Sequence, residues 1–195
     1  MMVKPQVHTL KANFNMKRIL VVVDAQNDFI TGSLNNEEAL KKIPNIVNKI
    51  EGENWDAIFA TLDTHGENYL DTREGKNVAL HCVKNTDGWR LNKSVSLALL
   101  TKENITEFVE KPTFGSYELV TKIVELVEDE PCYIELVGFC TDICVVSNAM
   151  LIKAALFESA DICVDASCCA GVTPESHKAA LNTMKMCQID VINED

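Results

Sequence analysis

Short runs of aliphatic and β-branched residues alternate with longer helix-like segments along most of this 195-residue chain. This alternation is typical of βαβ units, and it predicts an α/β protein with a parallel sheet. The predicted strands lie near residues 18–23, 57–62, 105–110, 133–137, 161–164 and 189–192.

The segments between the predicted strands carry helix start signals, because each begins with a side chain that can cap the first helical N–H groups. We expect helices from Asn36 to about residue 51, from Ser116 to about 128, from Asp142 to 157, and from Thr173 with Pro174 to about 186. The connection 63–104 is much longer than usual, so we expect it to contain functional loops and a short helix.

Composition and charge limit the partners of this chain. Its formal net charge of -11 would repel nucleic acid and anionic membranes, so small molecules are the expected partners. Eight cysteines without a C-x-x-C pair, no secretory signal and no early apolar run of spanning length predict a reduced, cytoplasmic protein. Met16-Lys17-Arg18 resembles a second start, so we expect residues 1–16 to be an N-terminal extension and residues 17–195 to form one domain.

Chemically active side chains follow the predicted strands. These residues are Asp24, Asp63, Lys111, Cys144 and Asp165. Ligands of open parallel sheets bind at the carboxyl ends of the strands, so an acid, a lysine and a cysteine are expected to meet at one edge. Each residue alone has a plain structural alternative, since a strand-end Asp often caps the next helix and a lone lysine is usually solvated.

Cys144 lies where the apolar run 134–137 and the turn from Gly138 lead into a helix-like stretch. If Thr141 or Asp142 caps that helix, Cys144 falls in its first turn, where free N–H groups and the helix dipole favour a nucleophilic thiolate. The alternative is that Cys144 is one of several buried structural cysteines.

A second cluster of polar residues lies in the long connection. Asp63 and His65 are two residues apart, His81 follows, and Glu74 lies between the histidines. Imidazole and carboxylate ligands suit a divalent transition metal, for which we expect zinc first, with iron or manganese as alternatives. On spacing alone, these histidines could equally be satisfied loop residues.

Together these motifs resemble the isochorismatase-like cysteine hydrolases, and within them the nicotinamidases. The stretch Val23-Asp24-Ala25-Gln26-Asn27-Asp28-Phe29 resembles the D-x-Q-x-D-F signature of the family, and Gly138 to Val145 resembles its nucleophile turn, G-x-x-T-D-x-C-V. Lys111 matches the third catalytic position, and Asp63, His65, His81 and Glu74 match the metal ligands of one nicotinamidase branch. The resemblance spans roughly residues 17–192.

The resemblance implies a three-layer α/β/α sandwich, Rossmann-like, with a six-stranded parallel sheet, and a Cys144-Asp24-Lys111 triad that hydrolyses an amide through a thioester. It further implies an oxyanion hole formed by the backbone N–H groups of Cys140 and Cys144, and a cis peptide between Phe139 and Cys140. The metal would orient the ring of nicotinamide or pyrazinamide.

Several alternatives stay open. Phe29 and Trp89 are candidate substrate walls but could be core residues. Glu67 or Asp71 could replace Glu74 as a ligand. The substrate could be another small amide or carbamoyl compound, which would not need the metal. A non-enzymatic redox sensor is suggested by Cys140, Cys144 and the pair Cys168-Cys169, although the pair is better explained as buried small hydrophobes. We also expect a homo-oligomer.

Overall fold

The computed structural model describes residues 16–128 and 130–194. A six-stranded parallel sheet forms its centre, in the strand order β3-β2-β1-β4-β5-β6. The strands are β1 (Lys17–Val23), β2 (Ala57–Asp63), β3 (Thr106–Lys111), β4 (Cys132–Phe139), β5 (Ala160–Ala170) and β6 (Asp190–Ile192). The predicted six-stranded parallel sheet is therefore confirmed.

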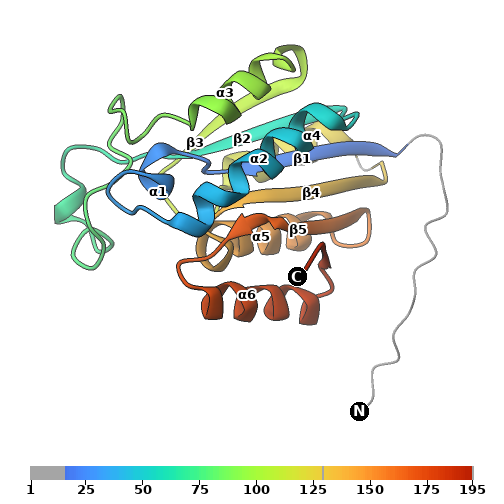
Figure 1. Cartoon of the computed structure of the whole chain (residues 1–195). Coiled ribbons are helices and arrows are strands. Elements are labelled where there is room, and N and C mark those ends of the chain that lie inside the picture. Colours follow the sequence, from blue (N-terminus) through green and yellow to red (C-terminus); the bar gives the residue numbers. More distant parts are fainter. Residues whose placement is uncertain (1–15, 129, 195) are drawn as a thin grey trace.

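Helices cover both faces of the sheet, as Figure 1 shows. They are α1 (Asn27–Ile30), α2 (Glu37–Gly52), α3 (Lys93–Leu100), α4 (Tyr117–Val127), α5 (Val146–Leu156) and α6 (Pro174–Met186). Alternate residues of β1 point to opposite faces. Ile19, Val21 and Val23 pack with α4, α5 and α6, whereas Leu20 and Val22 pack with α1, α2 and α3. The structure is the predicted α/β/α sandwich. It has two apolar cores, one on each face of the sheet.

The predicted caps explain where three helices begin. Asn36 accepts hydrogen bonds from the N–H groups of Glu38 and Ala39 at the start of α2, and Ser116 accepts one from Leu119 at the start of α4. Thr173 caps α6, which has Pro174 in its first turn. These contacts satisfy N–H groups that have no partner inside the helix.

The strand order reverses at the boundary between β1 and β4, which makes this boundary the topological switch point of the sheet. Glycine is required here. Gly138 has a φ of 115°, and a Cβ atom would lie 2.0 Å from the carbonyl oxygen of Val23. The close approach of β4 to β1 brings the residues after these two strands together.

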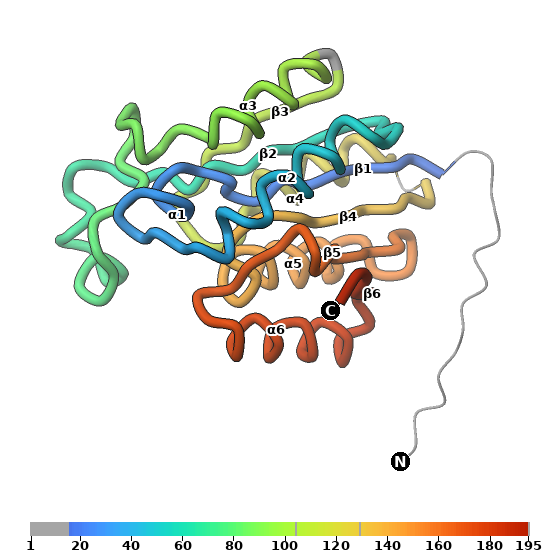
Figure 2. The backbone as a smooth tube through the Cα atoms, in the orientation of Figure 1, coloured from blue at the N-terminus to red at the C-terminus, as the bar shows by residue number. Residues whose placement is uncertain are grey.

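The loops of the long connection between β2 and β3 lie beyond the carboxyl ends of the strands, where Figure 2 shows them in teal and green. The connection contains one turn of 3₁₀ helix (Tyr69–Asp71), the short helix α3, which packs on a face of the sheet, and a second 3₁₀ turn (Glu103–Ile105). The predicted short helix is therefore present.

One strand differs from its prediction. β5 continues to Ala170, and its pairing with β4 shifts so that Leu136 faces Val164 while Gly138 faces Cys169. Asp165 is therefore not at a strand end. Its carboxylate lies 2.9 Å from Lys49 Nζ, so this acid belongs to a buried ion pair with α2 and not to the predicted edge.

Two further predictions concern chain limits. The N-terminal extension falls outside the described residues except for Met16, and the assignment of residues 17–195 to one domain stays a prediction. Within the described residues, no helix is long and apolar enough to cross a membrane.

Candidate active site

Four predicted site residues meet at the carboxyl edge of the sheet. Asp63 and Lys111 end β2 and β3 and face each other in the strand register, Asp24 directly follows β1, and Cys144 lies in the turn after β4. All four side chains are buried, and Cys144 is 5% exposed. The strand ends thus bring an acid pair, a lysine and a cysteine together.

Lys111 lies at the centre of this group. Its Nζ is 2.6 Å from Asp24 Oδ2 and 3.5 Å from both Cys144 Sγ and Asp63 Oδ1. Burial alone would lower the pKa of Lys111, but the charges of Asp24 and Asp63 and the hydrogen bond to Asp24 raise it above its usual value. The lysine is therefore held as an ammonium that both carboxylates share.

Asp24 is fixed by its neighbour on β2. Its backbone adopts φ 46°, a left-handed conformation that Asp tolerates, and its N–H contacts both oxygen atoms of Thr61. The Thr61 hydroxyl donates a 2.6 Å hydrogen bond to Asp24 Oδ1. Burial raises the pKa of Asp24, and Lys111 opposes that rise. We did not predict Thr61, although its position two residues before Asp63 places both side chains on one face of the strand.

The turn after β4 contains the cis peptide between Phe139 and Cys140 that the family resemblance implied. Residues Thr141–Val145 form a π-helical turn, and α5 begins only at Val146. The carbonyl of Cys140 accepts hydrogen bonds from the N–H groups of Ile143 and Val145.

Neither predicted cap residue caps this turn. The Thr141 hydroxyl lies 2.8 Å from His177 Nδ1 on α6, and the Asp142 carboxylate accepts a hydrogen bond from the Val172 N–H. Both side chains therefore tie the turn to the segment that leads into α6. The prediction that one of them caps the helix is wrong, because these tertiary partners compete successfully for their oxygen atoms.

The surroundings of Cys144 oppose the predicted thiolate. Burial raises the pKa of Cys144 well above its usual value, and the Asp24 carboxylate raises it further, whereas Lys111 opposes the rise. Formation of a nucleophilic thiolate therefore calls for a base beside the sulfur.

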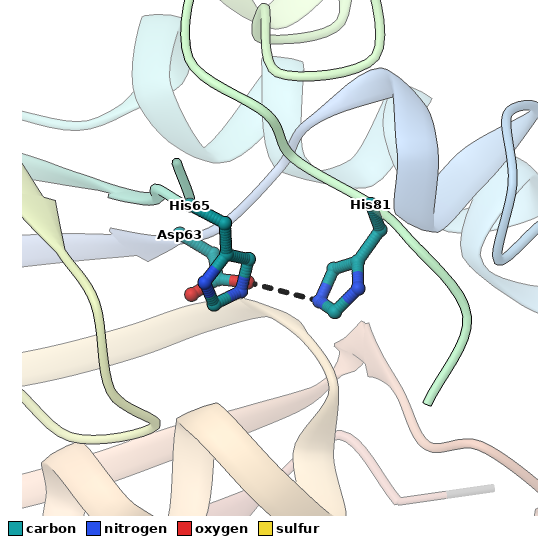
Figure 3. A group of neighbouring side chains, drawn as sticks. All are labelled: Asp63, His65 and His81. Carbon is teal, nitrogen blue, oxygen red and sulfur yellow. Dashed lines mark hydrogen bonds and ion pairs between the residues drawn. The ribbon is translucent and has the colours of Figure 1, made fainter. Parts of the chain in front are cut away.

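Three potential metal ligands, Asp63, His65 and His81, point toward one another, as Figure 3 shows. His65, two residues after the end of β2, forms an isolated parallel bridge with Val83, which brings His81, two residues before Val83, next to it. Asp63 Oδ2 lies 2.9 Å from His65 Nε2 and 3.2 Å from His81 Nε2. Ligand atoms around tetrahedral zinc are about 3.3 Å apart, so the three donors fit a single ion.

The hydrogen bonding of His81 supports that fit. Its Nδ1 lies 2.8 Å from the Ala79 carbonyl, which can only accept, so Nδ1 carries a proton. The lone pair of Nε2 in the neutral ring then faces an oxygen of Asp63. Two acceptors at this distance need a shared proton or a metal ion between them. Metal-binding histidines usually donate their other ring N–H to a group such as a backbone carbonyl, as His81 does to Ala79.

Glu74 is a second acid, after Asp63, that lies within 4 Å of both imidazoles. Its Oε1 lies 3.9 Å from His65 Nε2 and 3.8 Å from His81 Nε2, and it accepts a hydrogen bond from the Tyr69 hydroxyl. Glu67 and Asp71 are exposed, whereas Glu74 is half-buried. The group of described residues that could hold an ion consists of Asp63, His65 and His81, without any of these three acids. The geometry favours Glu74 as the fourth ligand.

The two aromatic candidates differ in position. Phe29 is buried, with its ring edge-on to His81 at a centroid distance of 5.5 Å. Trp89 donates a hydrogen bond from Nε1 to the Thr64 hydroxyl and lines a cavity of about 600 Å³ with Leu62 and Phe108. Phe29 therefore lies against the potential metal site, whereas the contacts of Trp89 link it to the loop after Asp63.

All eight cysteines are free thiols. Cys168 and Cys169 are buried in the two apolar cores, as expected of small hydrophobes. Burial raises the pKa of the half-buried Cys140 to about 12, so this thiol is not activated. These features give no support to a redox sensor.

A doubly wound parallel sheet that brings a buried cysteine, acid and lysine together at the carboxyl ends of its strands is the arrangement expected of a hydrolase with a cysteine nucleophile. The family model described as the isochorismatase domain matches residues 18–195, so the chain belongs to the isochorismatase family.

Proteins of known sequence or structure agree with this assignment. The uncharacterized isochorismatase family protein PncA of Bacillus subtilis (strain 168) is 28% identical over 143 residues, which are 69% of this chain and 78% of the relative. The crystal structure of the nicotinamidase/pyrazinamidase PncA from Bacillus subtilis matches with a TM-score of 0.79 at 26% identity, covering 91% of this chain and 100% of that one. The Pyrococcus horikoshii pyrazinamidase in complex with zinc matches with a TM-score of 0.68 at 26% identity, covering 91% and 99%.

Proposed function

We propose that this protein hydrolyses nicotinamide to nicotinate and ammonia, and that it also accepts pyrazinamide. The observation that carries the proposal is the position of Lys111 between the Asp24-Cys144 pair and Asp63, which belongs to the potential metal group. Similar solved structures at 26% identity are a nicotinamidase/pyrazinamidase and a zinc-bound pyrazinamidase.

In the proposed first step, Asp24 takes the proton of Cys144 as the sulfur attacks the carboxamide carbon. The buried carboxylate fits this role, because burial raises the pKa of Asp24 and so makes it a stronger base toward the thiol. Lys111 stays charged beside the new thiolate.

The tetrahedral intermediate would carry its negative charge on the former amide oxygen. We propose that the N–H groups of Cys140 and Cys144 hold this oxyanion, a role in which each donor is typically worth about 3 kcal/mol. Asp24 returns its proton to the leaving nitrogen, ammonia departs, and a thioester remains on Cys144. Asp24 then accepts a proton from water, the hydroxide attacks the thioester carbon, and the C–S bond breaks. The Cys144 thiolate takes the proton back from Asp24, and nicotinate is released.

Asp63, His65 and His81, with Glu74 as the fourth ligand, would hold a divalent ion, for which zinc is the first candidate. When bound, the ion supplies a Lewis acid that accepts the ring nitrogen of the substrate and so orients it. Phe29, edge-on to His81, would form one wall for the ring, and Trp89 is the second candidate wall.

Ammonia release from nicotinamide, pyrazinamide and aliphatic amides, each with and without a chelator, tests the proposal. We expect turnover of the two ring amides and its loss on chelation. Activity restricted to aliphatic amides and indifferent to the chelator would refute the nicotinamidase assignment.

A further inference from the structure

The signature after β1 contains two polar residues that the proposed reaction does not use. Gln26 and Asp28 follow Asp24, yet neither contacts the Cys144-Lys111 pair; both contact the loops that carry the potential metal ligands. These contacts suggest a role that is different from the chemical steps.

The side-chain amide of Gln26 forms hydrogen bonds with both the N–H and the carbonyl group of Asp63. Its Oε1 accepts a 2.7 Å hydrogen bond from the Asp63 N–H, and its Nε2 donates a 2.9 Å hydrogen bond to the Asp63 carbonyl. The same Nε2 donates a 2.7 Å hydrogen bond to the carbonyl of Trp89. The side chain is fully buried, so water cannot replace these three bonds.

Asp28 fixes the second loop. Its Oδ2 accepts a 2.7 Å hydrogen bond from the N–H of Cys82, the residue after His81, while Oδ1 accepts one from Ser33. A Cβ atom on Gly88 would lie 2.1 Å from Oδ2, so the loop approaches this carboxylate as closely as its backbone allows. Asp28, which follows β1, therefore holds the backbone of Cys82, the residue next to His81.

We propose that Gln26 and Asp28 are positioning residues of the metal centre, which hold Asp63 and His81 at the spacing that one ion requires. The proposal rests on the metal-assisted function proposed above. Hydrogen bonds behind the ligands fix their orientation before the metal binds, and the loss of such a bond typically lowers metal affinity about 10- to 100-fold.

A matched control separates this role from a general contribution to stability. Asn148 is another fully buried amide with three backbone hydrogen bonds, to the Ser116 N–H and to the carbonyls of Phe114 and Cys144. None of its partners carries a potential metal ligand. Gln26→Met and Asn148→Leu therefore remove equal numbers of buried hydrogen bonds, but only the first removes them from the metal loops.

The experiment measures zinc affinity of the full chain by competition with a chromophoric chelator, and unfolding by urea in the metal-free state. We expect both variants to lose stability, and only Gln26→Met to bind zinc about 10- to 100-fold more weakly than the wild type. Equal zinc affinity of Gln26→Met and wild type would overturn the proposal, as would an equal loss in Asn148→Leu.

A second variant keeps the test decisive if Gln26→Met does not fold. Asp28→Asn has nearly the same shape but only one oxygen for two N–H donors, so we expect weaker zinc binding with a smaller loss than in Gln26→Met. Unchanged affinity in Asp28→Asn would contradict the proposal. A wild-type protein that does not bind zinc would instead refute the zinc part of the proposed function.

Discussion

Replacing Lys111 by methionine tests the electrostatic core of the site. Methionine keeps most of the buried aliphatic chain but removes the ammonium that lies 2.6 Å from Asp24 Oδ2. At an effective dielectric constant near 20, that contact alone corresponds to about 6 kcal/mol of attraction, which is offset by the cost of burying the charge. Breaking one side of a buried pair typically costs about 3–5 kcal/mol, which is the loss of unfolding free energy that we expect at pH 8.

The loss should depend on pH. Burial already raises the pKa of Asp24, and without Lys111 that pKa rises further above its value in the unfolded chain. The folded variant then binds a proton that the unfolded chain releases, so its stability falls as pH rises through the pKa of the folded state. The deficit of Lys111→Met relative to wild type should therefore be small at low pH and largest in alkaline solution.

Urea denaturation, followed by tryptophan fluorescence between pH 4 and 8, measures these differences. In an Asp24→Asn background no carboxylate is left unpaired at this position, so Lys111→Met should cost clearly less there than in the wild-type chain. An equal cost in both backgrounds, or a deficit independent of pH, would refute the idea that this ion pair organises the site.

Four further predictions concern activity and stability. Cys144→Ala should abolish ammonia release but still bind zinc, and undiminished turnover would contradict the nucleophile assignment. His65→Ala should lose zinc, measured by metal analysis, and should need more substrate for half-maximal rate. Asp24→Asn should stop hydrolysis. It should also let iodoacetamide modify Cys144 faster at pH 8, because the Asp24 charge raises the pKa of that thiol. Slower modification would argue against this effect of Asp24 on the thiol. Lys49→Met should lose about 3–5 kcal/mol in urea unfolding, because it leaves Glu135 and Asp165 buried without their lysine.

The convergence of Asp24, Asp63 and Lys111 could be predicted because it depends only on strand order and polarity. An apolar run followed by a polar residue marks the end of a parallel strand, and all such ends lie on one edge. The same reasoning failed for Asp165. The residues after it, Ala166 to Ala170, are small and do not look like a strand, but their pairing with Gly138 and Phe139 extends β5 beyond the acid.

The direction in which the pKa of Cys144 is shifted could not be predicted from local sequence. The helix-terminus argument used only the residues near the cysteine in the chain, whereas the two largest effects on its pKa come from burial and from Asp24, 120 positions earlier. Thr61 and His177 were missed for the same reason, since they reach the site from β2 and α6. Gln26 and Asp28 lie in a signature that can be read in the sequence. Their hydrogen-bond partners, which lie in the loops of the potential metal ligands, could not be predicted from it.

The charge balance of the site links the two halves of the proposed mechanism. Asp24 and Asp63 are both buried, but they share a single ammonium, and the charge of Asp63 contributes to raising the pKa of Asp24. If Asp63 lacked other cationic partners, it would compete with Asp24 for Lys111. His81 donates its Nδ1 proton to the Ala79 carbonyl, so it neutralises Asp63 only when Nε2 takes a second proton, and contact with Asp63 raises the pKa of His81. With a divalent ion held between Asp63 and the imidazoles, Lys111 stays available to Asp24 and Cys144, so the metal centre would set the strength of the base as well as the position of the substrate.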